Sequence, residues 1–110
     1  MDENEPTPSN KKILMIDDDL AFLELYGTVF NSAGFNFSVA KNGIEALEKA
    51  KLEKPDLILL DIMLPDINGL EVLKRLKRDP ETSVLGRKVY FGLLELYSKS
   101  LKNEKDILLA

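Results

Sequence analysis

Apolar residues gather in two short unbroken runs along the first part of the chain. These runs, 13–16 and 57–60, both end on an aspartate. Such runs predict strands that are buried on both faces, as in a parallel sheet. Residues 35–39 alternate between apolar and polar, which predicts a strand at a sheet edge. We therefore expect strands over about 11–16, 35–39 and 56–60.

The segments between these strands carry apolar residues at helical spacing. Helices are expected over about 19–33, 42–53 and 68–78, the second and third capped by Asn42 and Asn68. Proline or glycine follows each helix closely. The residues expected to face the core from these helices are Phe22, Leu23, Tyr26, Phe30, Ile44, Leu47, Ala50, Leu70, Leu73 and Leu76.

The alternation of strand and helix predicts an α/β fold. Right-handed crossovers turn the order β-α-β-α-β-α into a parallel sheet with helices on both faces. Only 32 residues follow Arg78, and a βαβ unit takes roughly 30. We therefore expect an incomplete sheet of three or four strands.

The two ends of the chain differ from this core. Residues 1–10 are polar and acidic with two prolines, so we expect a disordered N-terminal arm before a core over 11–80. The segment 81–110 is expected to be mainly helical. Its apolar residues predict an amphipathic helix from Tyr90 to Lys102, with Tyr90, Leu93, Leu94, Tyr97 and Leu101 on one face.

Composition narrows the chemistry that the chain can perform. The net charge is −4, which disfavours nucleic-acid binding, and there is neither cysteine nor histidine. Disulfides, thiolate metal sites and histidine catalysis are thereby excluded. No apolar run is long enough to cross a bilayer. We expect a cytoplasmic protein that binds no nucleic acid and no membrane. Any phosphate chemistry would have to run through carboxylates.

Carboxylates follow two of the predicted strands. Asp17, Asp18 and Asp19 end the first strand, and Asp61 ends the run 57–60. Adjacent parallel strands would bring three or four of these groups to one edge, where they suit a small hard cation. These aspartates also have simpler interpretations. Aspartate is common in turns, which would explain Asp61, and acidic residues stabilise helix N-termini, which would explain the triplet. For Asp19 we expect only the helix-capping role.

The segments Ile13–Asp19 and Asp61–Gly69 resemble the receiver domains of two-component response regulators. The resemblance runs from about residue 11 to residue 80, with the motifs in the right order and Asp18 and Asp61 43 positions apart. It implies the flavodoxin-like (CheY-like) strand order. It also implies a histidine kinase or a phosphotransfer protein as partner.

The resemblance also assigns roles to individual residues. Asp61 would be the phospho-acceptor, and Mg²⁺ would be bound by Asp17, Asp18, Asp61 and the backbone carbonyl of Met63. This ligand set agrees with the preference of Mg²⁺ for oxygen.

The loop that follows Asp61 and the third helix carry further polar residues. Pro65 and Gly69 are expected to shape the loop, and Asp66 to be a solvated loop residue. A basic run over 74–78 is expected to be an exposed helix face that could meet an acidic partner.

The last third departs from the family pattern. Receivers usually have a strand that ends in Thr or Ser and a later one that ends in Lys-Pro. No Lys-Pro occurs, and a strand over 89–94 would place Leu93 at the hydroxyl position. No switch Thr/Ser or Lys is therefore identified, and we expect a truncated or diverged receiver. If 87–91 fails to pair with strand 56–60, the open edge predicts a homodimer, through the C-terminal helix or segment exchange.

Two functions remain open from the residues. The first is a receiver domain that accepts a phosphoryl group on Asp61, with no enzyme activity beyond self-catalysed transfer and autodephosphorylation. The alternative is a degraded receiver that acts as a phosphorylation-independent interaction or dimerisation module. A phosphatase of the haloacid-dehalogenase type is discounted, because its second acid would stand where Met63 lies.

Overall fold

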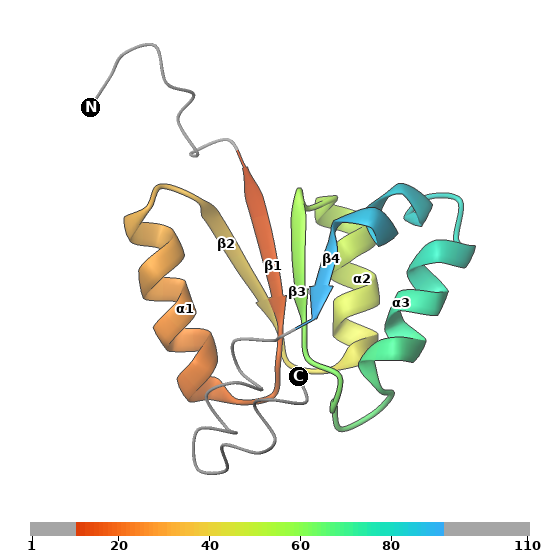
Figure 1. The fold of residues 1–110 in the computed structure, drawn as a ribbon, viewed down its shortest axis with the longest axis horizontal. Coiled ribbons are helices and arrows are strands. Elements are labelled where there is room, and N and C mark those ends of the chain that lie inside the picture. Colours follow the sequence, from red (N-terminus) through yellow and green to blue (C-terminus); the bar gives the residue numbers. More distant parts are fainter. Residues whose placement is uncertain (1–10, 92–110) are drawn as a thin grey trace, which may run out of the picture.

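The computed structural model describes residues 11–91, in which strands and helices alternate (Figure 1). The elements are β1 (Lys12–Ile16), α1 (Leu20–Ser32), β2 (Asn36–Ala40), α2 (Gly43–Glu53), β3 (Leu57–Leu60), α3 (Gly69–Arg78), a 3₁₀ helix η2 (Ser83–Lys88) and β4 (Val89–Phe91).

The four strands form one parallel sheet in the order β2-β1-β3-β4. This confirms the predicted α/β class and places β2 at an edge, as its alternating sequence indicated. Ile16 pairs with Ala40 on one side and with Leu60 on the other. The three strands therefore end at the same level, which positions the residues that follow β1 and β3.

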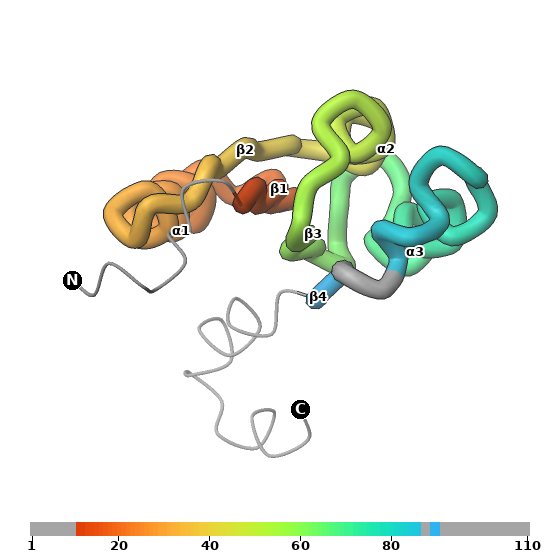
Figure 2. The backbone as a smooth tube through the Cα atoms, turned by 90° about the horizontal axis from the view of Figure 1, so that it is seen from above, coloured from red at the N-terminus to blue at the C-terminus, as the bar shows by residue number. Residues whose placement is uncertain are grey.

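Helices cover both faces of the sheet. Figure 2 shows α1 on one side and α2 and α3 on the other. Alternate residues of the central strands point to opposite faces, so Leu14 and Leu60 join the core under α2 and α3. Ile13 and Met15 are buried on the face of α1. Burial on both faces explains the unbroken apolar run of β1.

The core-facing residues of α2 and α3 share one spacing. Both helices begin with a buried glycine and bury the positions three and seven residues further on. The expected inward positions of Ile44 and Leu70 were wrong, because these side chains are 47% and 51% exposed. Each follows directly on the inward glycine, and successive helical residues are turned by about 100°. The inward residues are Gly43, Ala46, Ala50, Gly69, Val72 and Leu76.

Helix α1 packs through its aromatic side chains. Leu23 is buried, whereas Phe22, Tyr26 and Phe30 are half-buried. The ring of Phe30 lies 5.7 Å from that of Phe37 in β2, measured between centroids. Phe30, the last residue of the predicted aromatic stripe, therefore packs against the edge strand.

The segment after α3 corrects one prediction. Tyr90 and Phe91 lie in β4, paired in parallel with Leu59 and Leu60, so the helix start predicted at Tyr90 was wrong. Backbone hydrogen bonds to the edge of β3 outweigh the helical spacing of the side chains. The edge of β3 that was expected to be open if 87–91 failed to pair is therefore occupied by β4. The remaining helix prediction, the homodimer built on it and the 1–10 arm fall outside the described residues.

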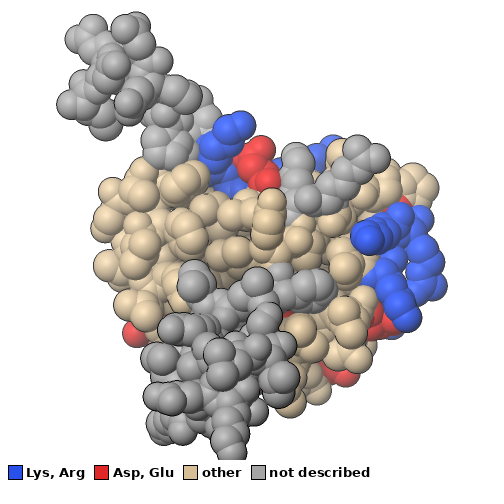
Figure 3. Space-filling view, viewed as in Figure 1, with Lys and Arg blue, Asp and Glu red and all other residues tan. Residues whose placement is uncertain are grey.

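Basic side chains gather over α3 (Figure 3). Lys74, Arg75, Lys77 and Arg78 are exposed, and both arginines form ion pairs with Glu71. The predicted exposed basic face is therefore present, and the pairing with Glu71 lowers its net charge. Within residues 11–91, no helix has the length and apolar character needed to span a bilayer.

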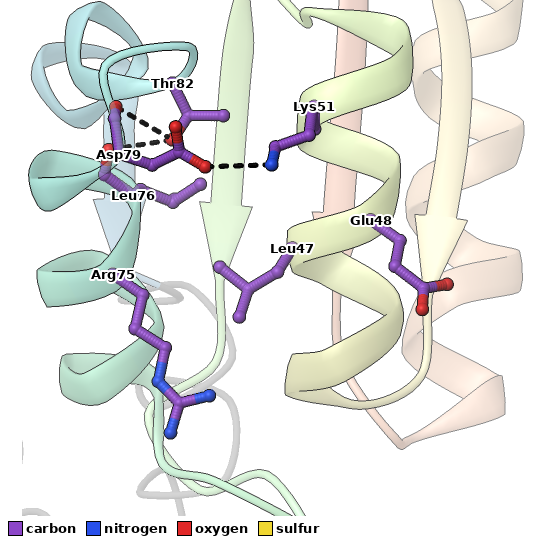
Figure 4. A pocket seen from close by; sticks show the side chains of 7 residues that line it. All are labelled: Leu47, Glu48, Lys51, Arg75, Leu76, Asp79 and Thr82. Carbon is purple, nitrogen blue, oxygen red and sulfur yellow. Dashed lines mark hydrogen bonds and ion pairs between the residues drawn. The ribbon is translucent and has the colours of Figure 1, made fainter.

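A cleft of about 310 Å³ separates α2 from α3 and the turn that follows α3 (Figure 4). Lys51 crosses it to Asp79, with 3.0 Å between Nζ and Oδ2. Beneath this ion pair, the buried hydroxyl of Thr82 donates a hydrogen bond of 2.8 Å to the carbonyl of Leu76. The hydroxyl thereby satisfies a carbonyl in the last turn of α3.

We expect Thr82→Val to lower the free energy of unfolding by about 1–2 kcal/mol, because it leaves the Leu76 carbonyl buried without its partner. Thr28→Val is the matched control, since the exposed hydroxyl of Thr28 donates to the Glu24 carbonyl within α1. Its effect should stay within about 0.5 kcal/mol. Urea unfolding followed by circular dichroism measures both, and equal losses would contradict the assigned role of Thr82.

Candidate functional site

Two aspartates meet where β1 and β3 end. Because Ile16 pairs with Leu60, the next residues, Asp17 and Asp61, lie side by side at the carboxyl edge of the sheet. The Asp61 amide donates to the Ile16 carbonyl at 2.9 Å, and the Asp17 amide donates to that of Ala40 at 3.0 Å. Backbone pairing thus continues through both aspartates and holds them in position.

Asp18 completes a cluster of three carboxylates. One oxygen from each of Asp17, Asp18 and Asp61 lies within 4.8 Å of the other two. Asp17 is 0% and Asp61 8% exposed, whereas Asp18 is exposed. The cluster therefore has two buried members and a third at the solvent.

The two buried carboxylates are held in the same way. Asp17 Oδ1 accepts a hydrogen bond of 2.8 Å from the amide of Asp19, and Asp61 Oδ1 accepts one of 3.1 Å from the amide of Met63. In both residues the buried Oδ2 has no hydrogen-bond partner among the residues that the structure describes. Unpartnered buried oxygens are costly, and neighbouring negative charges repel. Carboxylate oxygens at this spacing are suitable ligands for a hard cation such as Mg²⁺.

Asp19 stands apart from the cluster. Its Oδ1 accepts hydrogen bonds from the amides of Ala21 and Phe22 at 3.0 and 3.4 Å. It caps α1, as the sequence predicted. The acidic triplet is thus divided between a helix cap and the two members that lie near Asp61.

The loop after Asp61 closes back on itself at Gly69. The Gly69 amide donates to the Ile62 carbonyl at 2.7 Å. A Cβ at Gly69 would lie only 2.4 Å from the carbonyl oxygen of Asp61, so only glycine lets α3 begin this close to the Asp61 backbone. Met63 and Pro65 lie exposed within the loop.

Asp66 has a partner that the sequence did not indicate. It is exposed, as expected, yet its carboxylate accepts hydrogen bonds from the amides of Gly43 and Ile44 at 2.7 and 2.8 Å. Desolvation disfavours the charged carboxylate, but these hydrogen bonds outweigh it and lower the pKa of Asp66. No local pattern signals this contact, because the partners lie 22 and 23 positions away.

The family's hydroxyl and lysine positions cannot be placed on this structure. Strand β4 ends at Phe91, and Leu93 lies outside the described residues. What the described part holds at this edge is the acidic cluster and the loop that follows Asp61.

A family model described as the response regulator receiver domain matches residues 13–86. The chain therefore belongs to the family of response regulator receiver domains. These are signalling domains of two-component systems rather than enzymes of metabolism.

Several curated relatives are similar to it. The chain is 40% identical over 96 residues to the alkaline phosphatase synthesis transcriptional regulatory protein PhoP of Bacillus subtilis, covering 87% of this chain and 37% of that protein. It is 37% identical over 91 residues to sporulation initiation phosphotransferase F of the same organism, covering 83% and 73%. Since the chain spans little more than a third of the first relative, the activity of that whole protein does not transfer to it.

Solved structures share the fold. The N-terminal domain of a response regulator receiver protein from Methanoculleus marisnigri is 35% identical, with a TM-score of 0.71 over 76% of this chain and 66% of that one. Response regulator protein TrrA from Thermotoga maritima, solved in complex with Mg²⁺-BeF, is 32% identical. Its TM-score is 0.61, over 74% of this chain and 65% of that one.

We expect Asp61→Asn to stabilise the protein in the presence of a chelator, by on the order of 1 kcal/mol. The change removes one of two neighbouring buried charges and keeps the oxygen that accepts from Met63. Asp19→Asn is the control, because asparagine caps helices equally well and Asp19 lies outside the cluster. Urea midpoints in a chelator measure both, and a loss of stability in Asp61→Asn would contradict mutual repulsion in the cluster.

Proposed function

We propose that this chain accepts a phosphoryl group on Asp61, with Mg²⁺, as the receiver of a two-component phosphorelay. The observation that carries the proposal is the pair of buried Oδ2 atoms of Asp17 and Asp61, next to the exposed Asp18. Neither atom has a hydrogen-bond partner within the described part of the chain. An arrangement that destabilises the free protein is typical of a site that works with a bound cation.

The ligands proposed for Mg²⁺ are all oxygens. They are one carboxylate oxygen each from Asp17, Asp18 and Asp61, and the backbone carbonyl of Met63. Mg²⁺ is commonly bound by a few carboxylates together with water and substrate phosphate. TrrA, a similar receiver, was solved with Mg²⁺-BeF, which supports the proposal for this chain.

The transfer itself needs only a positioned carboxylate. An oxygen of Asp61 forms a P–O bond as the P–N bond of a phosphohistidine breaks, and the electron pair of that bond stays on the histidine nitrogen. The amide of Met63 holds the Asp61 carboxylate in one orientation through Oδ1. A bound Mg²⁺ would offset the negative charge that gathers on the phosphoryl oxygens.

The phosphoryl donor must lie outside the residues of this sequence. This chain contains no histidine, so a phosphohistidine has to be supplied by a histidine kinase or a phosphotransfer protein. Asp18 lies exposed at the mouth of the cluster, which leaves the site open to an approaching donor. We place this exchange in the cytoplasm, without a nucleic acid or a membrane as partner.

The alternative of a degraded, phosphorylation-independent module is less well supported. A domain that only binds partners would have no use for two buried, unpartnered carboxylate oxygens, which lower stability. Replacement of either aspartate by a neutral residue would remove that cost. The acidic cluster therefore favours the phospho-acceptor function.

We expect one phosphoryl adduct when the protein is incubated with Mg²⁺ and a small acyl phosphate, read by intact mass. Asp61→Asn and addition of a chelator should each abolish the adduct, because one removes the attacking oxygen and the other the cation. Asp19→Asn, which replaces a neighbouring carboxylate outside the cluster, should form the adduct as the wild type does. A folded wild-type protein that forms no adduct would favour the interaction module instead.

A further inference from the structure

The loop that carries Asp61 and Met63 is joined to a second helix. Asp66, in the middle of this loop, places Oδ1 2.7 Å from the amide of Gly43 and Oδ2 2.8 Å from that of Ile44. Both amides belong to the first turn of α2. The loop is therefore connected, through one carboxylate, to the start of α2, which lies 22 and 23 positions away along the chain.

A close steric contact supports the same connection. Ile67 lies against Gly43, where an added Cβ would come within 2.3 Å of Ile67 Cγ1. Without a side chain at Gly43, the loop and the helix can approach closely enough for Asp66 to reach both amides. Hydrogen bonding and packing thus act at the same place on α2.

The first turn of α2 takes its capping groups from two sources. Asn42 accepts from the amide of Glu45 at 2.8 Å, which is the ordinary cap from the residue before the helix. The amides of Gly43 and Ile44 are satisfied by Asp66 instead. The negative carboxylate is also favoured at the positive end of the helix. Asn42 and Asp66 therefore stabilise the same turn, but only Asp66 belongs to the loop after Asp61.

We propose that Asp66 is a positioning residue for the metal site. By holding the middle of the loop against α2, it keeps the Asp61 carboxylate and the Met63 carbonyl in the arrangement that Mg²⁺ requires. Ligands that are held in place before binding lose less freedom when the cation arrives. The inference rests on the proposed function and adds a residue outside the set of ligands.

The loop has the features of a segment that needs such a tether. Its N-terminal part is fixed by the hydrogen bond from the Met63 amide to Asp61, and its C-terminal part by that from the Gly69 amide to Ile62. Between these two points Pro65 and Asp66 are exposed. The hydrogen bonds from α2 to Asp66 thus anchor the exposed middle of the loop, together with the packing of Leu64 and Ile67 against the core.

Calorimetric titration with Mg²⁺ tests the inference on the full chain, using wild type, Asp66→Ala, Asp66→Asn and Asn42→Ala. We expect Asp66→Ala to weaken Mg²⁺ binding about tenfold, as is typical when a residue that orients metal ligands is removed. Asn42→Ala removes a cap from the same turn and should lower the unfolding midpoint, yet leave Mg²⁺ binding within about twofold. Asp66→Asn keeps one of the two acceptor oxygens and places an NH2 group, which cannot accept, at the second amide, so we expect an intermediate loss of affinity.

The outcomes separate the possible explanations. Equal Mg²⁺ affinity in wild type and Asp66→Ala would overturn the positioning role and leave the proposed function intact. A loss in Asn42→Ala as large as that in Asp66→Ala would overturn it as well, because weakening of the first turn of α2, rather than the contact between the loop and the helix, would then decide. A wild type that binds no Mg²⁺ would overturn the proposed function together with this inference. Circular dichroism at the titration temperature establishes that each variant is folded.

Discussion

The parallel pairing of β1 with β3 is the constraint on which the rest of the site depends. With Ile16 opposite Leu60, the residues that follow, Asp17 and Asp61, come to lie side by side at the buried carboxyl edge of the sheet. A shift of register by one residue would turn every side chain of a strand to the opposite face. The apolar core on both faces of the sheet therefore determines the position of the acidic cluster as well.

That position has an energetic consequence for the free protein. Two buried carboxylates lie close together, and each satisfies one oxygen through an amide two residues further along the chain. The second oxygen of each has no hydrogen-bond partner among the described residues. Under the proposed function, stability is traded for metal binding, as is common at functional sites. The flanking elements, with glycine at the start of α2 and α3, hold the surrounding backbone close enough to keep this geometry.

The family match and the acidic cluster lie in the same part of the chain. The family match spans residues 13–86, which includes all the carboxylates of the cluster. The loop between Asp61 and Gly69 connects this cluster to both α2 and α3. The loop thus reaches the first turns of two helices, through the Asp66 carboxylate at α2 and the Gly69 amide at α3.

The sequence by itself determined the order of the elements from β1 to α3, the caps at Asp19, Asn42 and Asn68, and the candidate carboxylates, because each depends on residues that are close along the chain. Only the tertiary structure decided which side chains face inward, since that depends on how each helix sits on the sheet. In the structure, Ile44 is exposed, Tyr90 lies in a strand, and Asp66 accepts a hydrogen bond from α2, 22 positions away along the chain. Contacts between distant segments leave no local pattern from which they could be predicted.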